Sequence, residues 1–188
     1  MGEIIYITGG ARSGKSTYGE NYIRVARGER EKVYIATAYV YDDEMKIRVE
    51  KHREQRGEGW QTVEKYKNLS EEIDKTMGDK KIILLDCVTN LVTNFMLENL
   101  EIEWGKIGKE RLQEMEIAIM EELKRLVQYI RRQGHVLVLV SNEVGMGIVP
   151  DNPLARHFRD IAGRVNQYCA EEADEAYLIV SGLKVKLK

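Results

Sequence analysis

The chain has 188 residues, a length typical of one domain, and we expect a single domain over residues 1–188. Its 29 Lys and Arg residues nearly balance 31 Asp and Glu residues, so the formal net charge is only −2. No overall positive field therefore favours binding to nucleic acid or to an acidic membrane surface. With 43% hydrophobic and 32% charged residues, the composition also excludes a disordered chain.

The first half of the chain alternates short apolar strands with polar helical segments. Ile4–Thr8 is an apolar run that ends at two glycines, and Lys15–Arg27 follows as a helix. Val33–Thr37 is a second strand, and an acidic start predicts a helix over residues 42–56. Lys81–Asp86 is a third strand, nearly all apolar until its last residue. Strands of this kind are typical of a parallel sheet that is covered on both faces.

The second half of the chain continues the alternation. Apolar residues spaced three or four apart predict one long helix over Glu110–Gln133. His135–Val140 follows as a buried strand, and a glycine-rich loop leads to a helix over Pro153–Glu172. Ala176–Val180 is a strand that a two-residue turn joins to an exposed edge strand, Leu183–Leu187. The pattern predicts a doubly wound α/β fold: a mostly parallel sheet flanked by helices, with an antiparallel C-terminal edge.

A phosphate-binding loop (P-loop) follows the first predicted strand. The sequence GGARSGKS fits G-x-x-x-x-G-K-[ST] and lies between a strand and a helix, as this motif requires. Its backbone N–H groups can wrap a phosphate at the positive end of the helix. We expect Lys15 to reach the β- and γ-phosphates, Ser16 to offer its hydroxyl to Mg²⁺, and Asp86 to hold that ion through water. The loop residues are Gly9, Gly10, Ala11, Arg12, Ser13, Gly14, Lys15 and Ser16.

This loop alone leaves a kinase, a nucleotide-dependent switch and a motor open. Guanine-specific switches usually carry Asn-Lys-x-Asp, and that tetrapeptide does not occur in the sequence. A switch is therefore disfavoured.

His52 lies in a helical segment rich in basic residues. The i, i+4 spacing in RVEKHREQR aligns Arg48, His52 and Arg56 on one helix face. A neutral imidazole in this setting can attack phosphorus while the arginines neutralise charge on the phosphate oxygens. Phosphoryl transfer at a P-loop needs no such nucleophile. Because a histidine in a charged helix is also typical of a solvated surface, the spacing alone leaves both interpretations open.

The cysteines and the N-terminal residues bear on the compartment. Cys87 and Cys169 have no metal-ligand spacing, and we expect both to be buried small apolar residues. The first apolar run lacks a basic flank and is too short for a signal peptide or a membrane span. We therefore expect a cytoplasmic protein with no transmembrane segment.

Sequence blocks spread along the whole chain match one known family in its own order. They are Thr8–Ser16, Tyr34–Ala38, Asp42–Met45, His52–Arg56 with Trp60–Glu64, Asp86–Thr89 with Asn94, Val140–Gly145 through Pro150, Arg156–Asp160, and Gly163 with Asn166, Gln167, Ala173 and Asp174. On these blocks the chain resembles the bifunctional adenosylcobinamide kinases and adenosylcobinamide-phosphate guanylyltransferases of cobalamin assembly.

The resemblance implies two reactions on one scaffold. The first phosphorylates adenosylcobinamide with GTP or ATP, and the second transfers GMP from GTP to that phosphate through a histidine-bound GMP. The products of the second reaction are adenosylcobinamide-GDP and pyrophosphate. Two alternatives stay open: a P-loop small-molecule kinase without guanylyl transfer, and a non-catalytic nucleotide-dependent regulatory or assembly protein.

The resemblance also assigns roles to individual positions. By its motif, His52 matches the catalytic histidine that carries GMP, beside Lys15 of the P-loop. Further nucleotide-site positions that match are Thr37, Ala38, Tyr39, Arg53, Glu54, Gln55, Arg56, Glu64 and Asp86. The implied fold is the recombinase-like P-loop sheet. Family members assemble as trimers, so the resemblance implies a homotrimer.

Overall fold

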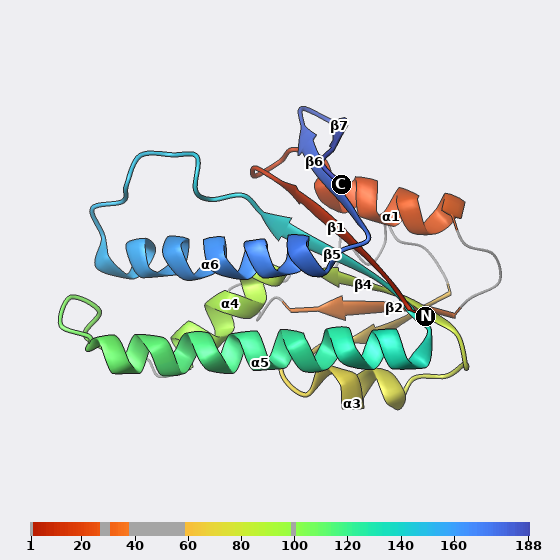
Figure 1. Ribbon diagram of the computed structural model, residues 1–188, viewed down its shortest axis with the longest axis horizontal. Coiled ribbons are helices and arrows are strands. Elements are labelled where there is room, and N and C mark those ends of the chain that lie inside the picture. The colour runs from red at the N-terminus through yellow and green to blue at the C-terminus, as the bar shows by residue number, and fades with distance from the viewer. Residues whose placement is uncertain (1, 27–30, 38–58, 99–100) are drawn as a thin grey trace.

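A computed structural model of the chain describes residues 2–26, 31–37, 59–98 and 101–188 (Figure 1). Within these ranges the chain forms a sheet of order β3-β2-β4-β5-β1-β6-β7, parallel throughout except for the antiparallel pair β6-β7. The strands are β1 (Glu3–Gly9), β2 (Glu31–Ala36), β3 (Trp60–Val63), β4 (Lys81–Asp86), β5 (Val136–Asn142), β6 (Glu175–Val180) and β7 (Leu183–Lys186). The helix predicted over residues 42–56 lies outside the described ranges.

Helices cover both faces of the sheet. The helix α1 packs on one face, whereas α3, α4, α5 and α6 lie on the other (Figure 1). Their bounds are α1 (Lys15–Ala26), α3 (Leu69–Asp74), α4 (Val88–Leu97), α5 (Lys109–Gln133) and α6 (Pro153–Glu172). This arrangement confirms the predicted α/β fold with its antiparallel C-terminal edge.

Two apolar layers hold the sheet between the helices. Successive residues of a strand point to opposite faces, and in β1 Ile4 joins the layer under α5 and α6 while Ile5 joins the layer under α1. The same alternation in β4 and β5 buries both faces of the central strands. This explains why the central residues of these strands form uninterrupted apolar runs in the sequence.

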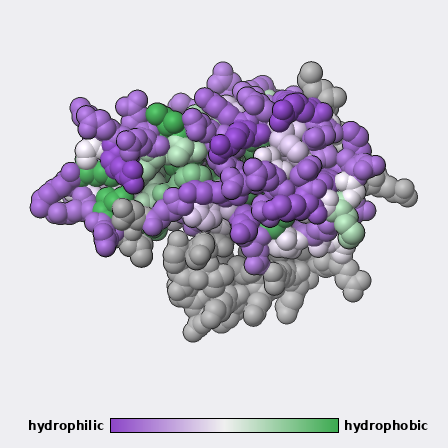
Figure 2. Space-filling view, turned by 90° about the horizontal axis from the view of Figure 1, so that it is seen from below, coloured by the Kyte–Doolittle hydropathy of each residue, from purple (hydrophilic) through white to green (hydrophobic). Residues whose placement is uncertain are grey.

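The amphipathic helix α5 has the predicted stripe. Met115, Ile119, Leu123 and Ile130 are among its buried residues, and it ends at Gly134, whose positive φ of 68° suits glycine. The surface over α5 and α3 is mainly hydrophilic, with apolar patches toward its left end (Figure 2). This helix therefore covers the sheet on one side and faces water on the other.

One buried carboxylate joins α5 to α3. Glu122 is only 1% exposed, and its Oε1 accepts the N–H of Leu69 at 2.8 Å. Its Oε2 pairs with Arg125 at 2.9 Å. Because Asn68 gives no side-chain cap to α3, Glu122 satisfies an amide that the start of this helix would otherwise leave unpaired.

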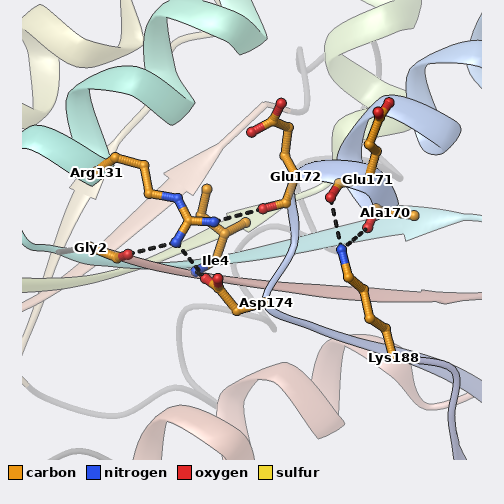
Figure 3. A network of polar contacts seen from close by, with 8 residues as sticks. All are labelled: Gly2, Ile4, Arg131, Ala170, Glu171, Glu172, Asp174 and Lys188. Atoms are coloured by element: carbon orange, nitrogen blue, oxygen red, sulfur yellow. Dashed lines mark hydrogen bonds and ion pairs between the residues drawn. The ribbon is translucent and has the colours of Figure 1, made fainter.

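At the amino-terminal edge of the sheet, Arg131 ties three segments together (Figure 3). Its guanidinium donates to the carbonyl of Gly2 at 2.7 Å and to that of Glu172 at 2.8 Å. It also donates to Asp174 Oδ2 at 2.6 Å, and the same oxygen accepts the N–H of Ile4 at 2.8 Å. The end of α5, the start of β1 and the α6-β6 junction are thus joined by one side chain.

Candidate active site at the carboxyl edge of the sheet

The P-loop has the predicted position between β1 and α1. Its first residue, Gly9, allows a close approach that no other residue permits, because a Cβ there would lie 2.4 Å from the carbonyl oxygen of Ile179. Gly14 has a φ of +94°, which also favours glycine. The carbonyl of Ser13 accepts the N–H of Gly182 at 2.8 Å. The turn between β6 and β7 therefore supports the loop from outside.

The loop contains polar groups suited to an anion. Lys15 is 8% exposed, and its ammonium donates to the carbonyl of Gly10 at 3.0 Å. The hydroxyl of Ser13 is buried and has no hydrogen-bond partner among the described residues. A buried polar atom without a partner is costly, and a phosphate oxygen would supply one. Together with the N-terminus of α1, these groups fit a bound phosphate.

The strand order brings Asp86 near this loop. Asp86 ends β4 and is in register with Val140 of β5, which is in register with Ile7 of β1. Two strand spacings, about 10 Å, thus separate Asp86 from β1. The Ser16 hydroxyl lies in the first turn of α1 and is the second predicted oxygen ligand.

The donor set fits Mg²⁺ delivered with a nucleotide. Mg²⁺ is usually held by one or two protein oxygens together with substrate phosphates. Among the residues that the structure describes, no group of three or more His, Cys, Asp or Glu side chains is placed to hold a metal ion by itself. Ser16 and Asp86 supply oxygens of this kind, and their role as Mg²⁺ ligands stays a prediction.

Thr37 fixes the ends of β2 and β4. It is 1% exposed, its hydroxyl donates to the carbonyl of Cys87 at 2.7 Å, and the hydroxyl accepts the N–H of Cys87 at 2.9 Å. The Asn94 amide donates to the carbonyl of Thr37 at 2.6 Å. The predicted contact of Thr37 with nucleotide stays a prediction, as does that of Glu64, which is exposed directly after β3 at the far edge of the sheet.

A polar network at the end of β5 was not predicted from the sequence. Asn142 Nδ2 donates to Thr89 Oγ1 at 2.8 Å, and Ser141 Oγ donates to Asn166 Oδ1 at 2.6 Å. Asn166 Nδ2 donates in turn to the carbonyl of Asn142 at 3.0 Å. These bonds fix the end of β5 against α4 and α6. The sequence feature that could have indicated this network is the run of three polar residues, Ser141–Glu143, directly after an apolar run. Ligands of α/β sheets bind at such strand ends.

The two thiols are not candidate nucleophiles. Burial and the nearby charge of Asp86 raise the pKa of Cys87 to about 11, and burial raises the pKa of Cys169 to about 12. Both are buried and free. The expectation that they are buried small residues is confirmed.

The proposed GMP carrier and its neighbours lie outside the described residues. These predicted positions are Ala38, Tyr39, His52, Arg53, Glu54, Gln55 and Arg56. The structure therefore brings together the P-loop, Asp86 and the end of β5, and the role of His52 stays a prediction.

Residues 5–187 match the family model described as cobinamide kinase / cobinamide phosphate guanyltransferase. The chain belongs to this family. It is 47% identical to the bifunctional adenosylcobalamin biosynthesis protein CobU of Escherichia coli (strain K12), over 98% of the chain and 99% of that protein. It is 35% identical to the bifunctional adenosylcobalamin biosynthesis protein CobP of Pseudomonas aeruginosa, over 97% of the chain and 95% of that protein.

Among solved structures, the KaiC-like protein PH0186 from Pyrococcus horikoshii OT3 is 13% identical. Its TM-score is 0.47, over 94% of this chain and 71% of that chain. No helix in the described part of the chain is both long enough and apolar enough to span a membrane.

Proposed function

We propose that the chain phosphorylates the hydroxyl of adenosylcobinamide with a nucleoside triphosphate, and then transfers GMP from GTP to that phosphate through His52. The products are adenosylcobinamide-GDP and pyrophosphate. The observation that carries the proposal is a P-loop two strands from the acidic end of β4, at the same edge of the sheet, in a chain of the cobinamide kinase / cobinamide phosphate guanyltransferase family.

The P-loop residues serve the triphosphate. The N–H groups after Gly9 and the ammonium of Lys15 hold the β- and γ-phosphates and neutralise the charge that develops on them during transfer. Ser16 and Asp86 would hold Mg²⁺. When bound, this ion withdraws charge from the phosphate oxygens. Lys15 is already directed into the loop by its bond to the carbonyl of Gly10.

His52 is the proposed nucleophile for the GMP transfer. Its neutral nitrogen attacks the α-phosphorus of GTP, pyrophosphate leaves, and the phosphorus–nitrogen bond keeps GMP reactive toward the phosphate of the acceptor. Because only the neutral imidazole has the required lone pair, guanylylation is expected to weaken below about pH 6.5, the ordinary pKa of histidine, or below a lower pH if Arg48 and Arg56 depress that pKa. The phosphorylation step does not use His52.

The test is covalent labelling with GTP that carries ³²P at the α-phosphorus. We expect an acid-labile, alkali-stable label on the wild type and no label on His52→Ala, while this variant still phosphorylates adenosylcobinamide. His157→Ala is the matched control and keeps the label. A labelled His52→Ala variant refutes the nucleophile, and an unlabelled wild type that still phosphorylates the acceptor favours a simple kinase. An unlabelled chain that binds nucleotide without phosphorylating the acceptor favours a regulatory protein.

The family resemblance also supports a homotrimer, which sedimentation equilibrium of the purified chain tests directly. A monomer at micromolar concentration contradicts this proposal. We also propose a cytoplasmic location, which fractionation of cells that produce the chain tests.

A further inference from the structure

The kinase step of the proposed function releases a proton from the acceptor hydroxyl, and no residue discussed so far accepts it. Lys15 is a cation and Ser16 is a hydroxyl, and Asp86 is assigned to the metal ion. General bases that lie within reach of the reacting hydroxyl typically contribute a factor of about 10² to 10⁴ to the rate. The end of β5 carries a carboxylate that suits this task.

Glu143 lies directly beside the P-loop. It follows β5, the strand between the P-loop strand β1 and the acidic strand β4. Asn142 is in register with Gly9, and the N–H of Glu143 donates to the carbonyl of Gly9 at 3.0 Å. The backbone of Glu143 is thus tied to the first glycine of the loop.

The carboxylate of Glu143 is held in place before any substrate binds. Its Oε1 accepts the N–H of Gly145 at 2.5 Å, and the residue is half-buried. The polar network of Asn142 and Asn166 holds the preceding backbone. No hydrogen bond from the described part of the chain reaches Oε2, so this oxygen can accept a proton without the carboxylate reorienting.

The two carboxylates predicted from the sequence at this edge, Asp86 and Glu64, belong to strands farther from β1. Glu143 follows the adjacent strand, one spacing of about 5 Å away, while Asp86 is two spacings away. Glu64 follows β3, four spacings or about 19 Å from β1. Of these three residues, Glu143 is the one that follows the strand next to β1, and its backbone is bonded to the P-loop.

The surface next to Glu143 suits a large, partly apolar acceptor. The loop that leads from Glu143 to α6 exposes Met146, Ile148 and Val149 (81, 95 and 63% exposed). It crosses from the carboxyl end of β5 to the start of α6 (Figure 1). There, α6 and the end of α4 line an apolar hollow of about 480 Å³ that includes Met96 and Phe158. The loop that begins at Glu143 and the hollow where it ends together offer apolar surface for such an acceptor.

We propose that Glu143 is the general base of the phosphorylation step, an inference that rests on the proposed function. The acceptor hydroxyl gives its proton to Oε2 of Glu143 as its oxygen bonds to the γ-phosphorus. The bond between the γ-phosphorus and the β–γ bridging oxygen breaks, and the nucleoside diphosphate leaves with that electron pair. Glu143 then releases the proton to water.

The test is Glu143→Gln in the full chain. The amide oxygen of Gln can still accept the N–H of Gly145, so this variant keeps the loop contact and loses the proton acceptor. We expect the kcat for phosphorylation of adenosylcobinamide to fall 100-fold or more, with the KM for nucleotide unchanged within about threefold. GMP labelling by GTP, and GMP transfer to acceptor that is already phosphorylated, are expected to stay within about threefold of wild type.

The control is Glu121→Gln, an exposed residue of α5, which is expected to keep both activities. Phosphorylation by Glu143→Gln within threefold of wild type overturns the proposal. A parallel loss of phosphorylation, GMP labelling and nucleotide binding also overturns it, because that pattern indicates a structural role. If the wild-type chain becomes labelled with GMP but does not phosphorylate adenosylcobinamide, the proposed kinase activity is wrong. The proposed role of Glu143 as general base is then wrong as well.

Discussion

The tie that Arg131 makes at the amino-terminal edge gives the sharpest stability prediction (Figure 3). Replacing Arg131 with Met keeps most of the apolar stem and removes three hydrogen bonds, to two carbonyl groups and to Asp174. Two carbonyl groups and one carboxylate then lose their charged donor. These groups belong to segments that are up to 172 residues apart in the sequence, so no local contact replaces the tie.

The expected loss of stability follows from the three hydrogen bonds of Arg131 and from the exposure of the side chains that form them. A hydrogen bond to a charged group contributes about 1.5–3 kcal/mol when buried. The side chains of Arg131 and Asp174 are 27% and 42% exposed, so water replaces part of each bond and solvent screens the ion pair. We therefore expect Arg131→Met to lower the free energy of unfolding by about 2–3 kcal/mol. In a chain of this size the corresponding fall in Tm is roughly 4–12 °C.

The pH dependence of the free energy of unfolding is a second measure of the contact between Arg131 and Asp174. Burial acts to raise the pKa of Asp174, but the hydrogen bonds from Arg131 and from the N–H of Ile4 lower it overall. A lowered folded-state pKa stabilises the fold above the unfolded value of about 3.9, and this stabilisation is lost as the pH falls through the folded-state pKa. In Arg131→Met the loss of stability over that acidic range is expected to be smaller than in wild type.

Urea unfolding at pH 7 and at several pH values below 5 measures both effects. Arg132→Met is the matched control, because Arg132 is the next residue of the same helix and is exposed. It is expected to change stability by no more than about 0.5 kcal/mol. Equal losses in the two variants, or an Arg131→Met variant as stable as wild type, would refute the reasoning.

Two further substitutions test the loop and the core. Gly9→Ala is expected to destabilise the fold by about 1–3 kcal/mol in urea unfolding, because its Cβ would meet a backbone carbonyl oxygen at 2.4 Å. Gly10→Ala meets nothing within 4 Å and is the control, so equal losses would contradict the close-approach argument. Glu122→Ala is expected to lose about 2–3 kcal/mol, because the N–H of Leu69 is then buried without its partner. The control is Glu121→Ala, at an exposed position, whose stability is expected to stay near that of wild type. A Glu122→Ala variant as stable as this control would show that water replaces the carboxylate as partner of the Leu69 N–H.

The strands and the P-loop could be predicted because their signals are local. The strands β1, β4 and β5 each contain an uninterrupted apolar run, and the helices on both faces of the sheet explain that pattern. The long helix at 109–133 follows from its stripe, and Ser181 and Gly182 form the predicted turn with positive φ at both residues. The boundaries differ by one or two residues, as at β5, which continues to Asn142 where the prediction ended at Val140.

Three elements were not predicted, for different reasons. Trp60–Val63 is a four-residue strand at the edge of the sheet, with two polar residues at its centre, so neither run length nor alternation identifies it. Leu69–Asp74 is a single short helix whose start depends on Glu122 from another helix. Val88–Leu97 is buried on several sides against α5, α6 and β5, so its sequence lacks the one-sided stripe of a surface helix.

Only those parts of the site that a single sequence motif identifies could be predicted. The P-loop and Asp86 each follow from a strand end, but the position of β5 between them depends on two crossovers that no local pattern specifies. Asn142 and Glu143 could therefore be seen as polar residues after a strand, while their place beside Gly9 could not.

The order of the strands also limits how one nucleotide site can use the predicted residues. Gly9 ends β1, Asp86 ends β4, Thr37 follows β2 and Glu64 follows β3, so these residues form a row along the carboxyl edge. Glu64 lies four strands, about 19 Å, from the strand that carries the P-loop. No single phosphate group can contact both ends of such a row. If Glu64 binds nucleotide, it therefore binds either a part of the nucleotide remote from the P-loop phosphates or a second nucleotide. Either arrangement is compatible with two nucleotide-dependent reactions on one chain.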